Sequence, residues 1–177
     1  MILDFLKTAA NLKKISRQGW VDKLSLNHPE SVADHCYSMA IMSMVISDMR
    51  KYDSETILKM VLLHDLAEAR IGDYTPNQLS IEKKKKLENN AFNKIIDNLP
   101  ENIKSQYLQI WEDYQENISA ESKLVHQIDR LEMALQAKLY QKEGHSENKL
   151  ESFFESAKKD IDDPKLKELF TKIINDN

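Results

Sequence analysis

The chain has 177 residues, 41% of them hydrophobic, which suits one ordinary domain with a well-buried core. Only three glycines and four prolines are present, and this leaves little room for the turns of an all-β fold. The net charge of −4 provides no basic field, so nucleic acid is not an expected partner. A single cysteine, Cys36, excludes a disulfide framework and a cysteine-rich zinc site.

The N-terminal segment gives no sign of export. Residues 1–12 contain short apolar runs broken by Asp4 and Lys7, without the charged-then-apolar order of a signal peptide. No stretch of the sequence is long and apolar enough to span a bilayer. We therefore expect a cytoplasmic protein that does not use a membrane.

The first half of the chain alternates helical stripes with short connections. Residues 2–15 carry apolar positions at helical spacing; Ser16 to Trp20 follow, and then an irregular segment is expected through Pro29. Ser31 and Asp34 have the spacing of a capping box, which predicts that a helix begins at Ser31. The expected inward face of that helix consists of Val32, His35, Met39, Met42, Val45 and Ile46.

Two further helices are expected before residue 98. Asp53 or Ser54 can cap the first, which should carry His64 and Asp65. Ser80 can cap the second, whose lysine run at residues 83–86 is interpreted as a solvated face. The expected inward residues of this second helix are Leu87, Ala91, Phe92, Ile95 and Ile96.

The remaining sequence also predicts helices. Pro100 suits the first turn of one helix, and Ser119 can cap another that runs to Gly144 and carries Asp129 on its apolar stripe. The tail resumes helix at about residues 150–157 and again after Pro164. Since no segment shows sustained period-two alternation, we predict an all-α, single-domain helical bundle over residues 1–177. Its motif-bearing part is about 1–145, and its C-terminal helices are about 148–175.

The stretch from His64 to Pro76 contains the most informative polar residues. On a helix, Glu68 lies four residues after His64 and three after Asp65, so the three side chains can share one face. Two of them suit a divalent metal ion, and the third could move protons beside it. His-Asp pairs also arise by chance, and the alternative is a hydrogen-bonded core histidine next to a solvated aspartate.

Three ionisable residues lie on stripes that should face the core, namely His35, His64 and Asp129. A buried carboxylate without a partner costs several kcal/mol, so each residue needs an explanation. Singly, the histidines could bond to backbone carbonyls and Asp129 could pair with a basic side chain such as Arg130. Together with Asp65 they form a set of two histidines and two carboxylates from three helices, and one metal ion would compensate all four.

The order His35, His64-Asp65 and distant Asp129 resembles the signature of the HD-domain metal-dependent phosphohydrolases. The similarity is greater to the 5′-deoxynucleotidase branch of that family and covers about residues 1–145. The segments that carry it are Arg17-Gln18-Gly19-Trp20, Pro29 to His35, His64 to Glu68 with Gly72-Asp73, and Asp129 to Met133.

This resemblance implies hydrolysis of deoxyribonucleoside 5′-monophosphates to deoxyribonucleoside and phosphate, by a homodimer. One divalent ion is expected on His35, His64, Asp65 and Asp129. A mixed nitrogen and oxygen set suits Mn, Co, Fe, Ni or Zn without choosing among them. The ion would lower the pKa of its bound water and neutralise charge on the phosphoryl group.

Four more residues receive roles. Glu68 is placed to orient or deprotonate the water, and the resemblance makes Asp73 a second proton-handling residue near the leaving 5′-oxygen. A turn residue bonded to its own backbone is the alternative for Asp73. The resemblance assigns Arg17 to substrate binding and Trp20 to the sugar, where it would disfavour a ribose 2′-hydroxyl. In the bacterial member of the branch the arginine and tryptophan are adjacent, whereas two residues separate them here.

Some residues and activities stay open at this stage. Glu132 could support the metal centre or be a solvated helix residue, and Cys36 is expected to pack. His28, His126 and His145 have no assigned role. The rival activities are an HD phosphodiesterase, which in its two-metal form needs extra histidine ligands, and a triphosphohydrolase, which is generally longer. A non-catalytic HD module is the rival from another class, but such modules typically lose a ligand or the acid-base residue.

Overall fold

The computed structural model describes residues 2–176, and within that range the secondary structure is helical, with a single isolated β-bridge between Ser16 and Ser31. The all-α prediction is confirmed. No helix of the described residues has the length and apolar character needed to cross a membrane. The elements are α1 (Ile2–Asn11), the 3₁₀ helix η1 (Leu12–Lys14), α2 (Gln18–Leu24), α3 (Val32–Arg50), α4 (Ser54–Leu63), α5 (Glu68–Ile71), α6 (Ile81–Ile96), α7 (Glu101–Glu116), α8 (Ala120–Lys142), α9 (Glu147–Asp160) and α10 (Pro164–Ile174).

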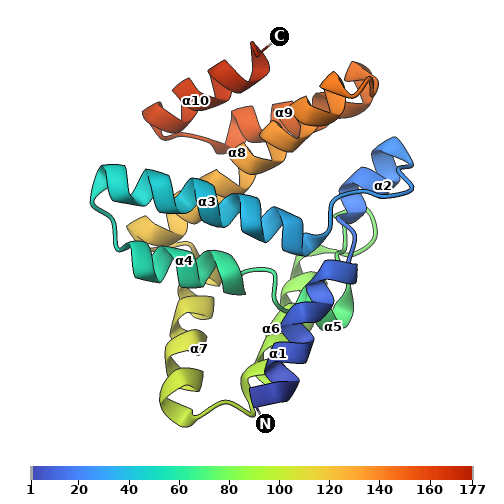
Figure 1. Ribbon diagram of the computed structural model, residues 1–177. Coiled ribbons are helices and arrows are strands. Elements are labelled where there is room, and N and C mark those ends of the chain that lie inside the picture. Colours follow the sequence, from blue (N-terminus) through green and yellow to red (C-terminus); the bar gives the residue numbers. More distant parts are fainter. Residues whose placement is uncertain (1, 177) are drawn as a thin grey trace.

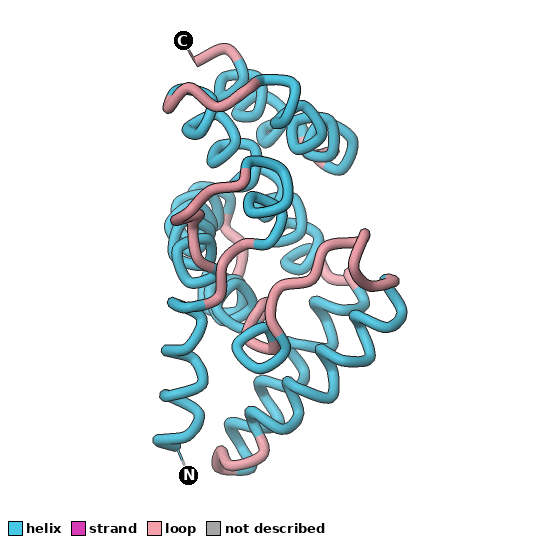
Figure 2. Tube along the Cα trace, turned by 90° about the vertical axis from the view of Figure 1, so that its right-hand side faces the viewer, coloured by secondary structure: helices cyan, strands magenta, loops and turns pink. Residues whose placement is uncertain are grey.

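The helices form three tiers along the long direction of the molecule. Figure 1 shows α3, α4 and α8 in the middle, with α1, α6 and α7 towards the N-terminus and α9 and α10 towards the C-terminus. The view turned by 90° keeps the two termini at opposite ends (Figure 2). The long helix α8 contacts α3 and α4 on one side and α9 and α10 on the other, so it joins the tiers.

Apolar side chains form two clusters that share α8. The larger cluster joins α3, α4, α6, α7 and α8, with Met39, Ile57 and Phe92 completely buried. The smaller cluster surrounds Trp20 and includes Tyr140 of α8 and Leu150 of α9. Because the second cluster contains residues of α2, α8 and α9, it fixes the short helix α2 and the C-terminal tier against one another.

Helix starts agree with the capping residues in the sequence. Ser31 is the N-cap of α3, its side chain accepts a hydrogen bond from Asp34 N, and the Asp34 carboxylate accepts one from Ser31 N, which completes the capping box. Four more N-cap side chains each accept a hydrogen bond from a backbone N–H of the first helical turn, namely those of Asp53, Ser80, Ser119 and Asp163.

Two backbone segments differ from the prediction. The segment expected to be irregular overlaps the end of α2, which is too short for a helical stripe to be recognised and is held by tertiary contacts of Trp20. The helix expected to carry His64 and Asp65 ends at Leu63. From there the chain continues through turns to α5, with Leu66 N and Glu68 N bonded three residues back to Leu63 O and Asp65 O.

The predicted burial or exposure of the side chain was wrong at three positions. Val45 is 49% exposed and Leu87 is 41% exposed, although both were expected to face the core. α3 has apolar side chains on both its buried and its exposed side, so hydropathy alone does not decide which side is inward. Lys84 was assigned to a solvated face, but it shares a helical stripe with Glu88, Ala91 and Ile95 and turns inward with them.

Candidate functional site

A pocket of about 480 Å³ opens between the N-terminal and C-terminal halves of the chain. The loop before α2, the turn between α4 and α5, and helices α6, α8 and α9 all contribute side chains. It contains every sequence-predicted site residue except His35, which lies fully buried behind it. Predicted residues that line the pocket are Arg17, Trp20, His64, Asp65, Glu68, Asp73 and Asp129.

Two buried imidazoles meet behind this pocket. His64 Nδ1 lies 2.7 Å from the Val61 carbonyl oxygen, and His35 Nδ1 lies 2.6 Å from Glu132 Oε2. A carbonyl oxygen or a carboxylate can only accept, so each Nδ1 donates its proton and each Nε2 is the ring nitrogen left for a further partner. Both Nε2 atoms are buried and have no hydrogen-bond partner. The site therefore holds two nitrogen donors that nothing in the protein satisfies.

Two carboxylates stand next to these nitrogens. Asp65 Oδ2 lies 3.1 Å from His64 Nε2 and 3.9 Å from His35 Nε2, and Asp129 Oδ1 lies 3.2 Å from His35 Nε2. Ligand atoms of His35, His64 and Asp129 all lie within 4.8 Å of one another. An imidazole lone pair and a carboxylate at such distances repel unless a proton or a metal cation lies between them. The four residues therefore fit a divalent ion.

Arg17 covers the carboxylates from the pocket side. Its Nη1 lies 3.2 Å from Asp65 Oδ2, and its Nη2 lies 4.0 Å from Asp129 Oδ1. Burial alone would raise the pKa of Asp65, but His64 and Arg17 outweigh it and hold the pKa of this carboxyl below its usual range. For Asp129 burial is again outweighed, here by His35, Arg130 and Arg17, and its pKa is well below the usual value. Both groups are thus ionised and ready to bind a cation.

Glu68 and Asp73 also line the pocket. Glu68 is 1% exposed, and its Oε2 has no hydrogen-bond partner. Burial, followed by the charges of Asp65 and Asp73, raises the pKa of Glu68 well above its ordinary value. A carboxyl group with a raised pKa can exchange a proton nearer to neutral pH.

Asp73 bonds across the fold and not to its own turn. Its Oδ2 accepts a hydrogen bond of 2.8 Å from Gln18 N at the start of α2. Gly72 has φ +85°, which lets the chain turn sharply between α5 and Asp73. The arrangement ties the loop that carries Asp73 to the segment that carries Arg17.

Trp20 forms the back wall of the pocket and is only 2% exposed. Its Nε1 donates a 2.7 Å hydrogen bond to Glu30 Oε1, and its ring centroid lies 4.1 Å from that of Phe153 and 5.2 Å from that of Tyr140. Phe153 of α9 also lines the pocket. It was not predicted from the sequence, because the last thirty residues contain no recognisable motif.

The structure shows the surroundings of two further residues whose roles the sequence left open. Glu132 is buried and bonds to His35 Nδ1, so it fixes the imidazole and is not a solvated helix residue. Burial raises the pKa of the Cys36 thiol well above its usual value, which agrees with a packing role. His126 lines the pocket, where its Nε2 donates to the Tyr114 carbonyl at 2.9 Å and its ring stacks on Tyr114.

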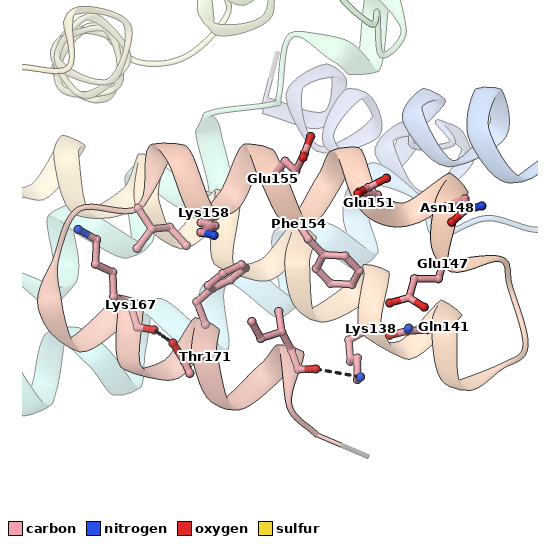
Figure 3. A pocket seen from close by; sticks show the side chains of 13 residues that line it. Lys138, Gln141, Glu147, Asn148, Glu151, Phe154, Glu155, Lys158, Lys167 and Thr171 are labelled. Carbon is pink, nitrogen blue, oxygen red and sulfur yellow. Dashed lines mark hydrogen bonds between the residues drawn. The ribbon is translucent and has the colours of Figure 1, made fainter.

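A second pocket, of about 890 Å³, lies among α8, α9 and α10 (Figure 3). Phe154 projects into it, and charged side chains such as Glu147, Glu151 and Lys158 surround it. Lys138 is already engaged there, because its Nζ donates to the Ile174 carbonyl at 3.1 Å. Among the described residues this pocket contributes no member to a candidate metal-binding group, so the smaller pocket is the candidate active site.

The helical fold and the converging histidine and aspartate side chains define an HD-domain protein. The family model described as HD domain matches residues 9–169, and the chain belongs to this family. HD domains are metal-dependent, and this chain contains the candidate cluster of His35, His64 and Asp129.

Its relatives extend the similarity beyond the motifs. The 5′-deoxynucleotidase HDDC2 of Homo sapiens is 36% identical over 173 residues, covering 97% of this chain and 84% of the relative. The protein of the same name from Dictyostelium discoideum is 37% identical over 185 residues, covering 98% and 97%. A solved conserved hypothetical protein from Pyrococcus furiosus superposes with a TM-score of 0.80 at 30% identity, covering 97% and 98%. These matches include the C-terminal helices, which the motif resemblance did not reach.

Proposed function

We propose that this protein is a metal-dependent 5′-deoxynucleotidase, which hydrolyses deoxyribonucleoside 5′-monophosphates to deoxyribonucleoside and phosphate. The observation that carries the proposal is the convergence of two unpartnered imidazole nitrogens and two carboxylates beside one pocket. Relatives that bear the name 5′-deoxynucleotidase and match nearly the whole chain support it.

His35, His64, Asp65 and Asp129 would hold one divalent ion, with Mn, Co, Fe, Ni and Zn as the candidates. When bound, such an ion lowers the pKa of a coordinated water and neutralises phosphoryl charge. Glu132 and the Val61 carbonyl would keep both imidazoles in the tautomer that presents Nε2. Arg17 would move from the two carboxylates to a substrate oxygen, for which its planar fork is suited.

Proton transfer is assigned to two further carboxylates of the pocket, Glu68 and Asp73. Glu68 would take a proton from the attacking water, a role that its burial and raised pKa support. Asp73 would handle a proton near the leaving 5′-oxygen, and its bond to Gln18 N supports a fixed position. Trp20 would lie behind the sugar, with Phe153 beside it.

The test is phosphate release from a nucleotide panel with each candidate metal. We expect release from dAMP in the presence of one or more of the metals, little release from dATP or cyclic AMP, and none after chelation. His64→Asn should abolish the activity, whereas His28→Asn, which changes an exposed histidine, should not. Preferred hydrolysis of dATP or cyclic AMP would show one of the rival HD activities, and no hydrolysis with any metal would show a non-catalytic module.

We further propose that the protein forms a homodimer through α3. Tyr37, Ile41, Val45 and Met49 are 69%, 45%, 49% and 75% exposed and follow one another at helical spacing. The stripe is symmetric about Ser43, so in an antiparallel pair Tyr37 meets Met49 and Ile41 meets Val45 of the second copy, as a two-fold interface requires. A helix that is apolar all round is usually buried all round.

Light scattering after size exclusion tests the dimer. We expect the wild type to have twice the mass of one chain, and Ile41→Lys to have the mass of one chain. Ile118→Lys, at a 67% exposed position after α7, should leave the dimer intact. An unchanged mass for Ile41→Lys would exclude this interface. The cytoplasmic location and the single-domain organisation over residues 1–177 stay predictions.

A further inference from the structure

Lys84 is the member of the lysine run at 83–86 that enters the pocket. Its side chain is 29% exposed, whereas Lys83, Lys85 and Lys86 are classed as exposed. Lys84 Nζ lies 3.1 Å from the Tyr74 carbonyl oxygen and 3.3 Å from Glu68 Oε1. Two further carboxylates are near, with Asp73 Oδ1 at 3.7 Å and Glu88 Oε1 at 3.5 Å.

These acceptors come from three separate segments. Glu68 begins α5, Asp73 and Tyr74 belong to the loop after it, and Glu88 lies one turn along α6 from Lys84. Glu68 and Asp73 carry like charges on the same wall and would repel each other. An ammonium between them removes that repulsion and ties the loop to α6.

Resting on the proposed function, we propose that Lys84 is a positioning residue for the two proton-handling carboxylates. Its ammonium holds Glu68 and Asp73 at the separation that proton transfer at the attacking water and at the leaving 5′-oxygen requires. An ammonium has three N–H donors, and four acceptors already surround Nζ. Two of these donors bond to Tyr74 O and Glu68 Oε1, and the carboxylates of Asp73 and Glu88 lie at ion-pair distances, so the Lys84 ammonium is already engaged by groups of the protein.

The charges around Glu68 support the same role. Burial, Asp65 and Asp73 raise the pKa of Glu68, while Lys84 and then Arg17 lower it. Loss of the Lys84 charge should therefore raise the pKa of Glu68 further. Because a general base works in its deprotonated form, the acidic limb of the rate profile would then move to higher pH.

The experiment measures kcat and KM for dAMP across a range of pH in the Lys84→Met variant and in the wild type, both loaded with metal. We expect kcat to fall roughly 10- to 100-fold, because misplaced catalytic groups cost about that much. KM should change less than about twofold, metal content should stay unchanged, and the acidic limb should move to higher pH. Lys84→Arg should recover most of the rate. Lys83→Met and Lys86→Met are matched controls from the same run and should behave as wild type.

Inorganic phosphate, used as a competitive inhibitor, separates positioning from phosphate binding. An inhibition constant that weakens more than about tenfold in Lys84→Met, with kcat unchanged, would make Lys84 a phosphate ligand and overturn the proposal. Wild-type kcat in Lys84→Met would overturn it too. If Lys84→Met does not fold, Lys84→Gln is measured with the same expectations, since its amide can still reach a carbonyl. A wild type inactive on dAMP would instead reject the proposed function.

Discussion

At the scale of single residues, the candidate site contains buried carboxyl groups whose pKa values are shifted in opposite directions. Asp65 and Asp129 have lowered pKa values because histidine and arginine side chains face them. Glu68, only three residues after Asp65, has a raised pKa because burial and two carboxylates dominate its surroundings. This division supports the proposed ligand roles of the first two and the proposed proton-transfer role of the third.

Replacing Glu68 by Gln keeps the size of the side chain but removes its ability to take a proton. Turnover should fall by about 10²-fold or more, with metal content unchanged in the purified protein. Glu82→Gln, at an exposed position of α6, is the control. In the wild type, the rate should fall as pH drops through the raised pKa of Glu68, so the acidic limb should lie above the ordinary value of 4.5. Loss of metal together with activity would make Glu68 a ligand.

Replacing Trp20 by Ala tests the selectivity for the sugar. A ribose 2′-hydroxyl placed against an apolar wall costs about 1–3 kcal/mol, or roughly 10- to 100-fold in kcat/KM. Trp20→Ala should therefore lower the ratio of kcat/KM for dAMP over AMP, with metal content unchanged. Phe153→Ala is the companion variant, because the Phe153 ring packs against Trp20 and lines the same pocket. An unchanged ratio in Trp20→Ala would leave the tryptophan as a core aromatic only.

At the scale of elements, α9 completes the pocket from the far end of the sequence. Phe153 contacts the Trp20 ring, and a Cβ added at Gly19 would meet the Phe153 ring at 3.4 Å, so α2 and α9 lie close together. Leu150, one turn before Phe153, is fully buried in the cluster around Trp20. The position of α9 therefore sets the shape of the pocket on the side of Trp20.

Leu150→Ala should destabilise the protein by about 2–5 kcal/mol, because it leaves a cavity where a complete leucine side chain was buried. Thermal or denaturant unfolding measures this change. The KM for dAMP should also rise, since Phe153 loses its support, while metal content stays the same. Leu169→Ala, at a 39% exposed position of α10, should cost much less. Equal costs at the two positions would contradict the tight packing of α9.

At the scale of the whole molecule, the metal ion would join the parts of the fold. Its four candidate ligands come from α3, from the turn after α4 and from α8, which are far apart in sequence. Binding to the folded protein alone stabilises it by about 2.7 kcal/mol when the free metal is at 100 times its dissociation constant. For a chain of this size, each kcal/mol shifts Tm by about 2–4 °C.

Asp129→Ala should abolish tight metal binding and, with it, the stabilisation by metal. We expect Tm of the wild type to rise by roughly 5–10 °C on adding the metal that supports activity. Tm of Asp129→Ala should not respond to the metal. Asp162→Ala, which changes an exposed aspartate between α9 and α10, should respond as the wild type does. Wild-type metal content in Asp129→Ala would reject this ligand assignment.

The sequence by itself determined the all-α class, the helix starts at Ser31, Ser80 and Ser119, and the family. These follow from local rules, because helical spacing and capping involve residues within one or two turns of each other. The histidines and aspartates were also recognisable, since ionisable residues on apolar stripes need a partner.

Only the tertiary structure decided the supporting residues. Glu132 holds His35 across 97 residues of sequence, and Lys84 reaches Glu68 from another helix. Phe153 meets Trp20 through the packing of α9, and α2 is too short to show a periodic pattern. Such contacts depend on how helices cross, and the hydropathy of one helix does not record which neighbour it meets.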